Sequence, residues 1–271
     1  MLAIALGVTL LAHIWSGWVW TWMLAELNQT VPTSKFVQVY LKTNIAKYLP
    51  GNIWHYYGRI AAARGAGIAA SIATLGVLLE PILMAAAALI VVLVGIQSIV
   101  INSRSSFQGL LILVLAAVLL AIHPRFLNLA IRFISRLKLK ANSNATDIGA
   151  FYVKRYPWRP LLGELGFIGL RSAGFLLTFL TLNSIATNQI PLLVAAFSLA
   201  WLLGLVIPVA PGGLGVFEVT AIALLEHSFS PAAVISAIAL YRVVSILAEA
   251  GGAGLAWLDE KLGTAMTNNH L

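Results

Sequence analysis

Long apolar runs separated by short polar stretches dominate the pattern along the chain. Most runs are about 16–30 residues long, which suits bilayer-spanning helices, and none alternates like a barrel strand. They predict spans over residues 2–24, 68–97, 107–122, 161–186, 190–208, 214–228 and 232–257. We therefore expect an all-α, polytopic membrane helix bundle that forms a single integral membrane domain over residues 1–271.

Residues 34–66 depart from this pattern, because lysines and arginines are spread through an amphipathic sequence there. The centre of this stretch, Tyr48-Leu49-Pro50-Gly51-Asn52, separates two segments that are too short and too polar to be full spans. Irregular backbone at membrane depth is tolerated only where protein buries it or where it lines a watery cavity. The stretch is therefore predicted to form a re-entrant or interfacial helical hairpin.

A second break, Pro208–Glu218, lies between two apolar runs. It contains two prolines, three glycines, among them Gly212 and Gly213, and the carboxylate of Glu218. An acid beside a helix break within membrane-grade sequence is a candidate for a functional site. The segment 190–228 is predicted to be either a second re-entrant hairpin or two closely packed spans.

Positive charge is concentrated in two loops, residues 31–66 and 123–160, which contain five and eight basic residues. The positive-inside bias places both loops in the cytoplasm, which puts the N-terminus outside and the C-terminus inside. The two Pro-Gly breaks then approach the membrane from opposite faces, as in an inverted repeat, where transporters place their substrate sites. The similarity between the breaks covers only a few residues, so the inverted repeat is one interpretation of it.

Composition limits the chemistry of the protein. The chain is 60% hydrophobic and 10% charged, against about 25% charged residues in a soluble domain. It has no cysteine, which excludes disulfides, thiolate metal sites and cysteine nucleophiles. It also lacks zinc-protease, Walker and nucleophile-elbow motifs. We therefore expect no catalytic residue, no metal site and no cofactor, and we expect the protein not to be an enzyme.

The net charge of +8 lies mostly in the two basic loops. Topology and contact with anionic membrane lipids explain this charge, so no nucleic-acid partner is expected. The stretch 124–159 begins with an apolar face and resembles a basic helix that lies on a membrane surface. Anionic lipid binding and a topology signal alone both account for it. A second copy of the chain or an envelope-synthesis enzyme is a candidate protein partner.

Several ionisable residues lie in or at the ends of the apolar runs: Glu80, Glu164, Arg171, Glu218, Glu226, Arg242 and Glu249. Each charge at mid-membrane costs at least about 2.5–3.5 kcal/mol, so several must face one another or water. Interhelical salt bridges are one explanation. The other is a polar cavity in which arginines, and backbone amides at the glycine break, meet a phosphate. Glu164 and Glu226 lie near span ends and are expected to be interfacial.

Three motifs in order resemble the lysylphosphatidylglycerol synthase transmembrane-region family, a flippase-like membrane domain that also occurs as stand-alone UPF0104-type proteins. They are Asn44–Asn52 leading to Gly58-Arg59, then Pro208–Glu218, then Leu240-Tyr241-Arg242. The resemblance covers nearly the whole chain. The chain departs from the family at Trp54-His55, because many members carry Gly-Asp after the first Pro-Gly pair, and a carboxylate is missing here.

The resemblance implies the lipid-translocating part of such proteins and not the aminoacyl-transfer enzyme, and it implies a further helix before the abrupt apolar start. The expected function is to bind a phospholipid or polyprenyl-phosphate-type lipid and to flip it between the leaflets of the inner (plasma) membrane. The alternative is a non-transporting accessory or scaffold subunit of a lipid-modifying or envelope-synthesis enzyme. The expected substrate-binding residues are Asn52, Arg59, Glu80, Arg171, Gly212, Gly213, Glu218 and Arg242.

Overall fold

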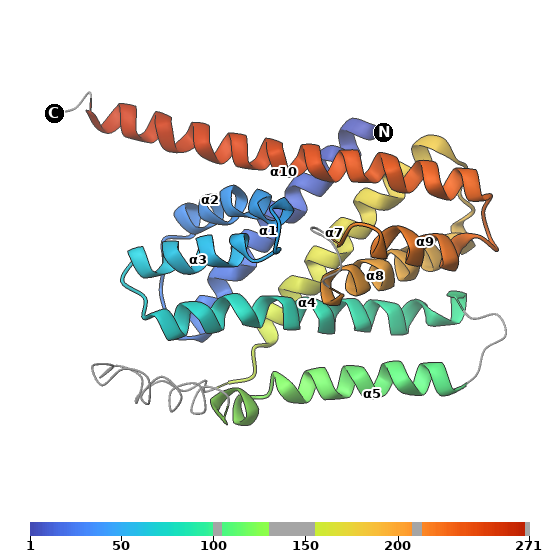
Figure 1. Cartoon of the computed structure of the whole chain (residues 1–271), viewed down its shortest axis with the longest axis horizontal. Coiled ribbons are helices and arrows are strands. Elements are labelled where there is room, and N and C mark those ends of the chain that lie inside the picture. The colour runs from blue at the N-terminus through green and yellow to red at the C-terminus, as the bar shows by residue number, and fades with distance from the viewer. Residues whose placement is uncertain (100–104, 130–154, 208–212, 269–271) are drawn as a thin grey trace.

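The computed structural model describes residues 1–99, 105–129, 155–207 and 213–268. These residues form helices and connecting turns, with no strand among them, which confirms the predicted all-α bundle. The helices are α1 (Leu2–Glu26), α2 (Thr33–Asn44), η1 (Ile45–Tyr48), α3 (Trp54–Gly65), α4 (Ala70–Ile99), α5 (Ser105–Ala121), α7 (Trp158–Leu182), η2 (Thr187–Gln189), α8 (Ile190–Val206), α9 (Val216–Leu225) and α10 (Pro231–Asn268) (Figure 1).

Within the described residues, five helices are long and apolar enough to cross a membrane. They are α1, the Ala70–Gly95 part of α4, α7, the Thr187–Val206 segment that contains α8, and the Pro231–Leu262 part of α10. The protein is therefore a multi-pass membrane protein. The predicted spans at 107–122 and 214–228 coincide with two shorter apolar helices, α5 and α9. Their crossing of the membrane stays a prediction.

The helices α2 and α3 lie side by side and are joined through η1 and a tight turn around Pro50 (Figure 1). Gly51 has φ +97° and Asn52 has φ +49°, in the left-handed region that glycine and asparagine tolerate best. The indole nitrogen of Trp54 donates a hydrogen bond to the carbonyl of Pro50 at 2.8 Å, next to the start of α3. The re-entrant placement of this hairpin and its relation to an inverted repeat stay predictions.

In Figure 1, α10 runs along one edge of the bundle and α5 along the opposite edge, with α1 and α7 crossing between them. Small residues let α1 and α7 approach closely, as is common in membrane bundles. A Cβ atom added at Gly163 would lie only 2.6 Å from a methyl carbon of Val19. The indole nitrogen of Trp15 also donates to the carbonyl of Gly163 at 2.7 Å. These contacts hold α1 and α7 close together.

An aromatic cluster holds α7, α8, α9 and α10 together. The ring of Phe175 stacks on Phe197 at a centroid distance of 5.3 Å and meets Tyr241 edge-on at 5.4 Å. Phe217 of α9 meets Phe197 edge-on at 5.7 Å. Such pairs contribute roughly 0.5–1.5 kcal/mol each beyond the area they bury. They position Tyr241, whose hydroxyl donates to the backbone carbonyl of Arg171 at 3.2 Å.

Candidate functional site

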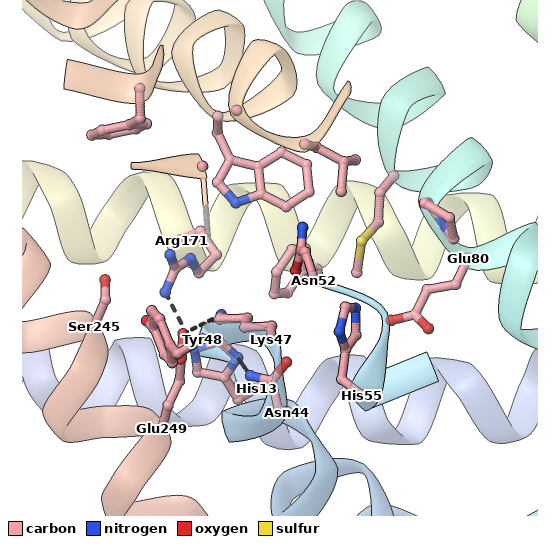
Figure 2. Close-up of a pocket in the computed structure, with 18 of the residues that line it drawn as sticks. His13, Asn44, Lys47, Tyr48, Asn52, His55, Glu80, Arg171, Ser245 and Glu249 are labelled. Carbon is pink, nitrogen blue, oxygen red and sulfur yellow. Dashed lines mark hydrogen bonds and ion pairs between the residues drawn. The ribbon is translucent and has the colours of Figure 1, made fainter. Parts of the chain in front are cut away.

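A cavity of about 150 Å³ lies at the centre of the bundle. Its lining comes from every α-helix named above except α5, and from η1 and the Pro-Gly turn. Figure 2 shows how side chains from these separate elements converge on it. The charged residues of the lining are Lys47, Arg59, Glu80, Arg171, Arg242 and Glu249. Most of these charges form ion pairs, each of which joins two different elements.

One ion pair joins the hairpin to α4. The guanidinium Nη1 of Arg59 donates to Glu80 Oε2 at 2.5 Å, and both side chains are buried. The hydroxyl of Tyr40 donates to Glu80 Oε1 at 2.6 Å, and its ring lies 3.7 Å from the guanidinium carbon of Arg59. Both carboxylate oxygens of Glu80 are therefore satisfied, as a buried charge requires.

A second ion pair joins the hairpin to α10. Lys47 Nζ donates to Glu249 Oε1 at 2.7 Å, and the Nε2 atom of His13 lies 3.2 Å from the same oxygen. The side-chain nitrogen of Asn44 lies 3.4 Å from His13 Nδ1. Glu249 is buried, so α10 contributes a carboxylate that α1 and η1 surround.

A third ion pair fixes the part of the second break that the structure describes. Arg242 Nε donates to Glu218 Oε1 at 2.6 Å, and Arg242 Nη2 donates to the carbonyl of Gly213 at 3.2 Å. The backbone N–H of Gly215 donates to Glu218 Oε2 at 2.6 Å. Gly213 has φ +70°, and a Cβ atom there would lie 2.9 Å from the carbonyl oxygen of Gly204. Glycine is thus required where this loop crosses α8.

Arg171 differs from the other basic residues of the cavity. Its side chain is buried, and no carboxylate of the described residues lies within 4.0 Å of it. Its Nη1 atom lies 3.2 Å from His13 Nε2, and its Nε atom has no hydrogen-bond partner in the described part of the chain. Figure 2 shows Arg171 pointing toward the cluster formed by His13, Lys47 and Glu249.

His55 contributes no charge to the cavity. It lies on α3, outside the five candidate spans, and its side chain is 7% exposed. Burial, with a smaller contribution from the positive charges of Arg59 and Lys47, lowers the pKa of His55 to about 3. The imidazole is therefore neutral at physiological pH. Burial also lowers the pKa of Lys47 from its ordinary value, while Glu249 opposes this change.

The structure brings most of the predicted site residues together. Lining the cavity are Asn52, Arg59, Glu80, Arg171, Gly213 and Arg242. Glu218 lies beside it and contacts Arg242. Gly212 falls outside the described residues.

Glu164 does not lie where the sequence suggested. Its position near a span end predicted an interfacial residue, but the side chain is fully buried, and neither carboxylate oxygen has a hydrogen-bond partner among the described residues. The reason is the length of α7, which begins at Trp158. Glu164 is thus in the second turn, next to Gly163, where α7 packs against α1. Glu226 is exposed, as expected for an interfacial residue.

Sequence reasoning missed several polar residues of the cavity, among them His13, Asn44, Lys47 and Ser245. Lys47 carried the best available signal, because it lies three residues before Pro50 within the first motif. The described residues contain no group of three or more histidine, aspartate or glutamate side chains that could hold a metal ion. The lining is instead suited to hydrogen bonds and charge pairing.

The fold and the cavity define a class of protein: a polytopic α-helical membrane protein whose centre is polar and largely charge-paired. A comparison with protein families matches residues 1–249 to the family described as lysylphosphatidylglycerol synthase TM region, and the chain belongs to this family. The match confirms the resemblance given by the motifs, and its range includes every charged residue of the cavity lining. No curated protein matches the chain.

Proposed function

We propose that the protein binds the phosphate-bearing headgroup of a membrane lipid in the central cavity and moves that lipid between the leaflets. The observation that carries this proposal is a central cavity with four basic side chains, one of which, Arg171, is buried and has no carboxylate partner in the described residues. Buried charges in membrane proteins are costly and usually functional. A guanidinium group offers two parallel donors that fit phosphate oxygens, so an anionic headgroup is the ligand that this lining favours.

The ion pairs supply a mechanism for movement. Arg59–Glu80 joins α3 to α4, Lys47–Glu249 joins η1 to α10, and Arg242–Glu218 joins α10 to α9. Phosphate oxygens compete with these carboxylates for the same cations. A headgroup that moves past these pairs therefore weakens contacts between elements during the crossing, and a ligand can shift a conformational equilibrium only through such differential contacts. In this proposal the lipid exchanges one set of interhelical pairs for another as it crosses.

We also propose the inner (plasma) membrane as the location, with the N-terminus outside and the C-terminus in the cytoplasm. The support is the excess of lysine and arginine in residues 31–66 and 123–160. The protein acts as a carrier in this proposal, so the lipid leaves chemically unchanged. Incubation with candidate lipid donors and mass spectrometry of the products tests this point, because any covalent product would contradict it.

A leaflet-reporter assay in proteoliposomes tests the proposal. Vesicles are loaded with fluorescent phosphatidylglycerol or a fluorescent polyprenyl phosphate, and a membrane-impermeant quencher reports the fraction in the outer leaflet. Wild-type protein should accelerate exchange, and Glu218→Gln and Arg242→Ala should slow it. Arg64→Gln, a change at an exposed arginine of α3, is the matched control. Equal exchange with wild-type protein, Glu218→Gln and Arg242→Ala would exclude the proposal.

The alternative, an accessory or scaffold subunit, depends on the basic stretch 124–159. Most of that stretch falls outside the described residues, and no described contact favours the alternative. The same assay separates the two functions, because a scaffold alone in vesicles leaves the exchange rate at the level of protein-free vesicles. Charge reversal at Arg125 and Arg155, followed by a pull-down of envelope-synthesis enzymes, then tests docking directly.

A further inference from the structure

We infer that the cavity selects its lipid by charge: it is built for a phosphodiester headgroup with one negative charge and a neutral second substituent, and Arg171 is the residue that holds the phosphate. This inference rests on the proposed function, because it specifies the ligand of the same cavity. It separates glycerol- or sugar-substituted phospholipids from phosphate monoesters, pyrophosphates and amine-bearing headgroups.

The first argument is the number of charges. Four basic and two acidic side chains line the cavity. Arg59 is paired with Glu80, and Lys47 with Glu249. Arg242 is paired with Glu218, which lies just beside the lining. One positive charge remains without a carboxylate among the described residues, and it belongs to Arg171. A single negative charge on the ligand neutralises it.

The second argument is the hydrogen bonding of Arg171. His13 Nε2 lies 3.2 Å from both Arg171 Nη1 and Glu249 Oε1. This one ring nitrogen cannot both accept a hydrogen bond from Arg171 and donate a hydrogen bond to Glu249. The amide nitrogen of Asn44 donates to His13 Nδ1, which places the imidazole hydrogen on Nε2 and directs it to Glu249. The nearby N–H group of Arg171 then has no acceptor. Together with the unpartnered Nε atom, it offers donors for two phosphate oxygens.

The third argument is the cost of a second negative charge. A phosphate monoester carries about −1.5 to −2 at pH 7, and a pyrophosphate carries more. The other basic side chains of the lining already have carboxylate partners. A second charge could be neutralised only if one of these pairs opened, which would leave a carboxylate buried without its cation. Ligands with more than one charge are therefore disfavoured.

The fourth argument concerns the second substituent of the phosphate. Both acidic residues of the lining, Glu80 and Glu249, already contact a cation, so an ammonium group would have to share one of these two carboxylates, through Glu249 Oε2, which has no hydrogen-bond partner among the described residues. Asn44, Asn52 and Ser245 instead present neutral polar groups. Figure 2 shows these residues around the same space as Arg171. Hydroxyl groups of a glycerol or sugar match this part of the lining.

Binding to the purified, detergent-solubilised full chain tests the inference without depending on transport. The probes are dihexanoyl phosphatidylglycerol, dihexanoyl phosphatidylethanolamine, dihexanoyl phosphatidic acid, farnesyl pyrophosphate, glycerophosphoglycerol and inorganic phosphate. Native mass spectrometry and ligand-induced shifts of the unfolding temperature give the affinities. Dihexanoyl phosphatidylglycerol should bind most tightly. Equal binding of phosphatidic acid or of phosphatidylethanolamine would overturn the charge match, and equal binding of glycerophosphoglycerol would overturn the assignment to a lipid.

Two variants make the test specific. Arg171→Gln should weaken binding of dihexanoyl phosphatidylglycerol by at least about tenfold, and Arg64→Gln should leave it unchanged. Glu80→Gln releases Arg59, whose guanidinium stays charged, from its pair and raises the surplus to two charges, so the preference should move toward phosphatidic acid. An unchanged affinity in Arg171→Gln, or an unchanged preference in folded Glu80→Gln, would overturn the inference. Arg171→Lys, which keeps the charge, serves if Arg171→Gln does not fold.

The two proposals fail in different ways. Selective binding of phosphatidylglycerol without any exchange between leaflets would overturn the proposed function and support the charge match. Exchange of phosphatidylglycerol and phosphatidylethanolamine at equal rates, with no loss in Arg171→Gln, would support the proposed function and overturn the charge match.

Discussion

Glu80 of α4 accepts a hydrogen bond from Arg59 of α3 at 2.5 Å, and each residue is only 2% exposed. Glu80 precedes Pro81, yet α4 stays helical through the proline. The pair therefore ties the Pro-Gly hairpin to the middle of a long span. A buried ion pair adds little net stability over an apolar pair, but removal of one partner is costly because the other charge stays buried.

Arg59→Met should lower the free energy of unfolding by roughly 3–5 kcal/mol, because it leaves the Glu80 carboxylate buried without a cation. Glu80→Gln in the same chain should restore most of the loss. A double-mutant cycle measured by denaturant unfolding in micelles gives the coupling energy. Additive effects of the two changes would show that the pair is not coupled.

Lys47→Gln should destabilise the protein far more than Lys42→Gln. Lys47 meets Glu249, whose side chain is 1% exposed, whereas Lys42 meets Glu260, whose side chain is 58% exposed. Loss of a partner by a buried carboxylate costs roughly 1–3 kcal/mol or more, and exposed pairs are screened by water and salt. Thermal unfolding of both variants at low and high salt provides the measurement. A larger effect at Lys42 would contradict the described geometry.

Gly213→Ala should be much more disruptive than Gly204→Ala, although the two glycines lie against each other. Alanine at φ +70° costs about 1–2 kcal/mol, and its Cβ would meet the Gly204 carbonyl oxygen at 2.9 Å. A Cβ on Gly204 has its nearest neighbour at 3.6 Å, which is an ordinary contact. Unfolding temperature and leaflet exchange should both fall for Gly213→Ala alone. Similar values for both variants would mean that the loop adjusts freely.

Glu164→Leu should stabilise the protein, because neither oxygen of this buried carboxyl group has a hydrogen-bond partner among the described residues. An unsatisfied buried polar group costs roughly 1–3 kcal/mol, and an apolar side chain of similar size removes that cost. Denaturant unfolding of Glu164→Leu and Glu164→Gln gives the comparison. A loss of stability in both variants would mean that the carboxyl group has a partner in the folded protein.

The sequence predicted the helices well where apolar length alone decides, as in α1 and α8. It did not indicate how far α10 continues beyond the predicted span 232–257, since the helix extends to Asn268. Polar contacts with α2 accompany this extension, from Lys42 to Glu260 and from Gln38 to Asp259. Hydropathy carries no information about such contacts between segments that are distant in the sequence.

The same limit applies to the cavity. Glu80 and Arg171 could be identified because a charge within an apolar run is conspicuous. Lys47 could not, since several other lysines and arginines are spread through its hairpin and topology already accounted for their charge. Its partner Glu249 is 202 residues away in the sequence. Only the packing of α10 against α2 and η1 shows that the two charges meet.

This separation has a consequence for biogenesis. Membrane proteins emerge from the ribosome with the N-terminal part first. Arg59 obtains its carboxylate early, because Glu80 follows after 21 residues. Lys47 obtains its carboxylate only much later, because Glu249 follows after 202 residues. A nascent protein whose α10 has not yet left the ribosome thus carries, at its centre, a lysine without its carboxylate partner. The last described helix to be synthesised supplies this partner and completes the assembly. Truncation before Glu249 should therefore mark the chain for membrane quality control.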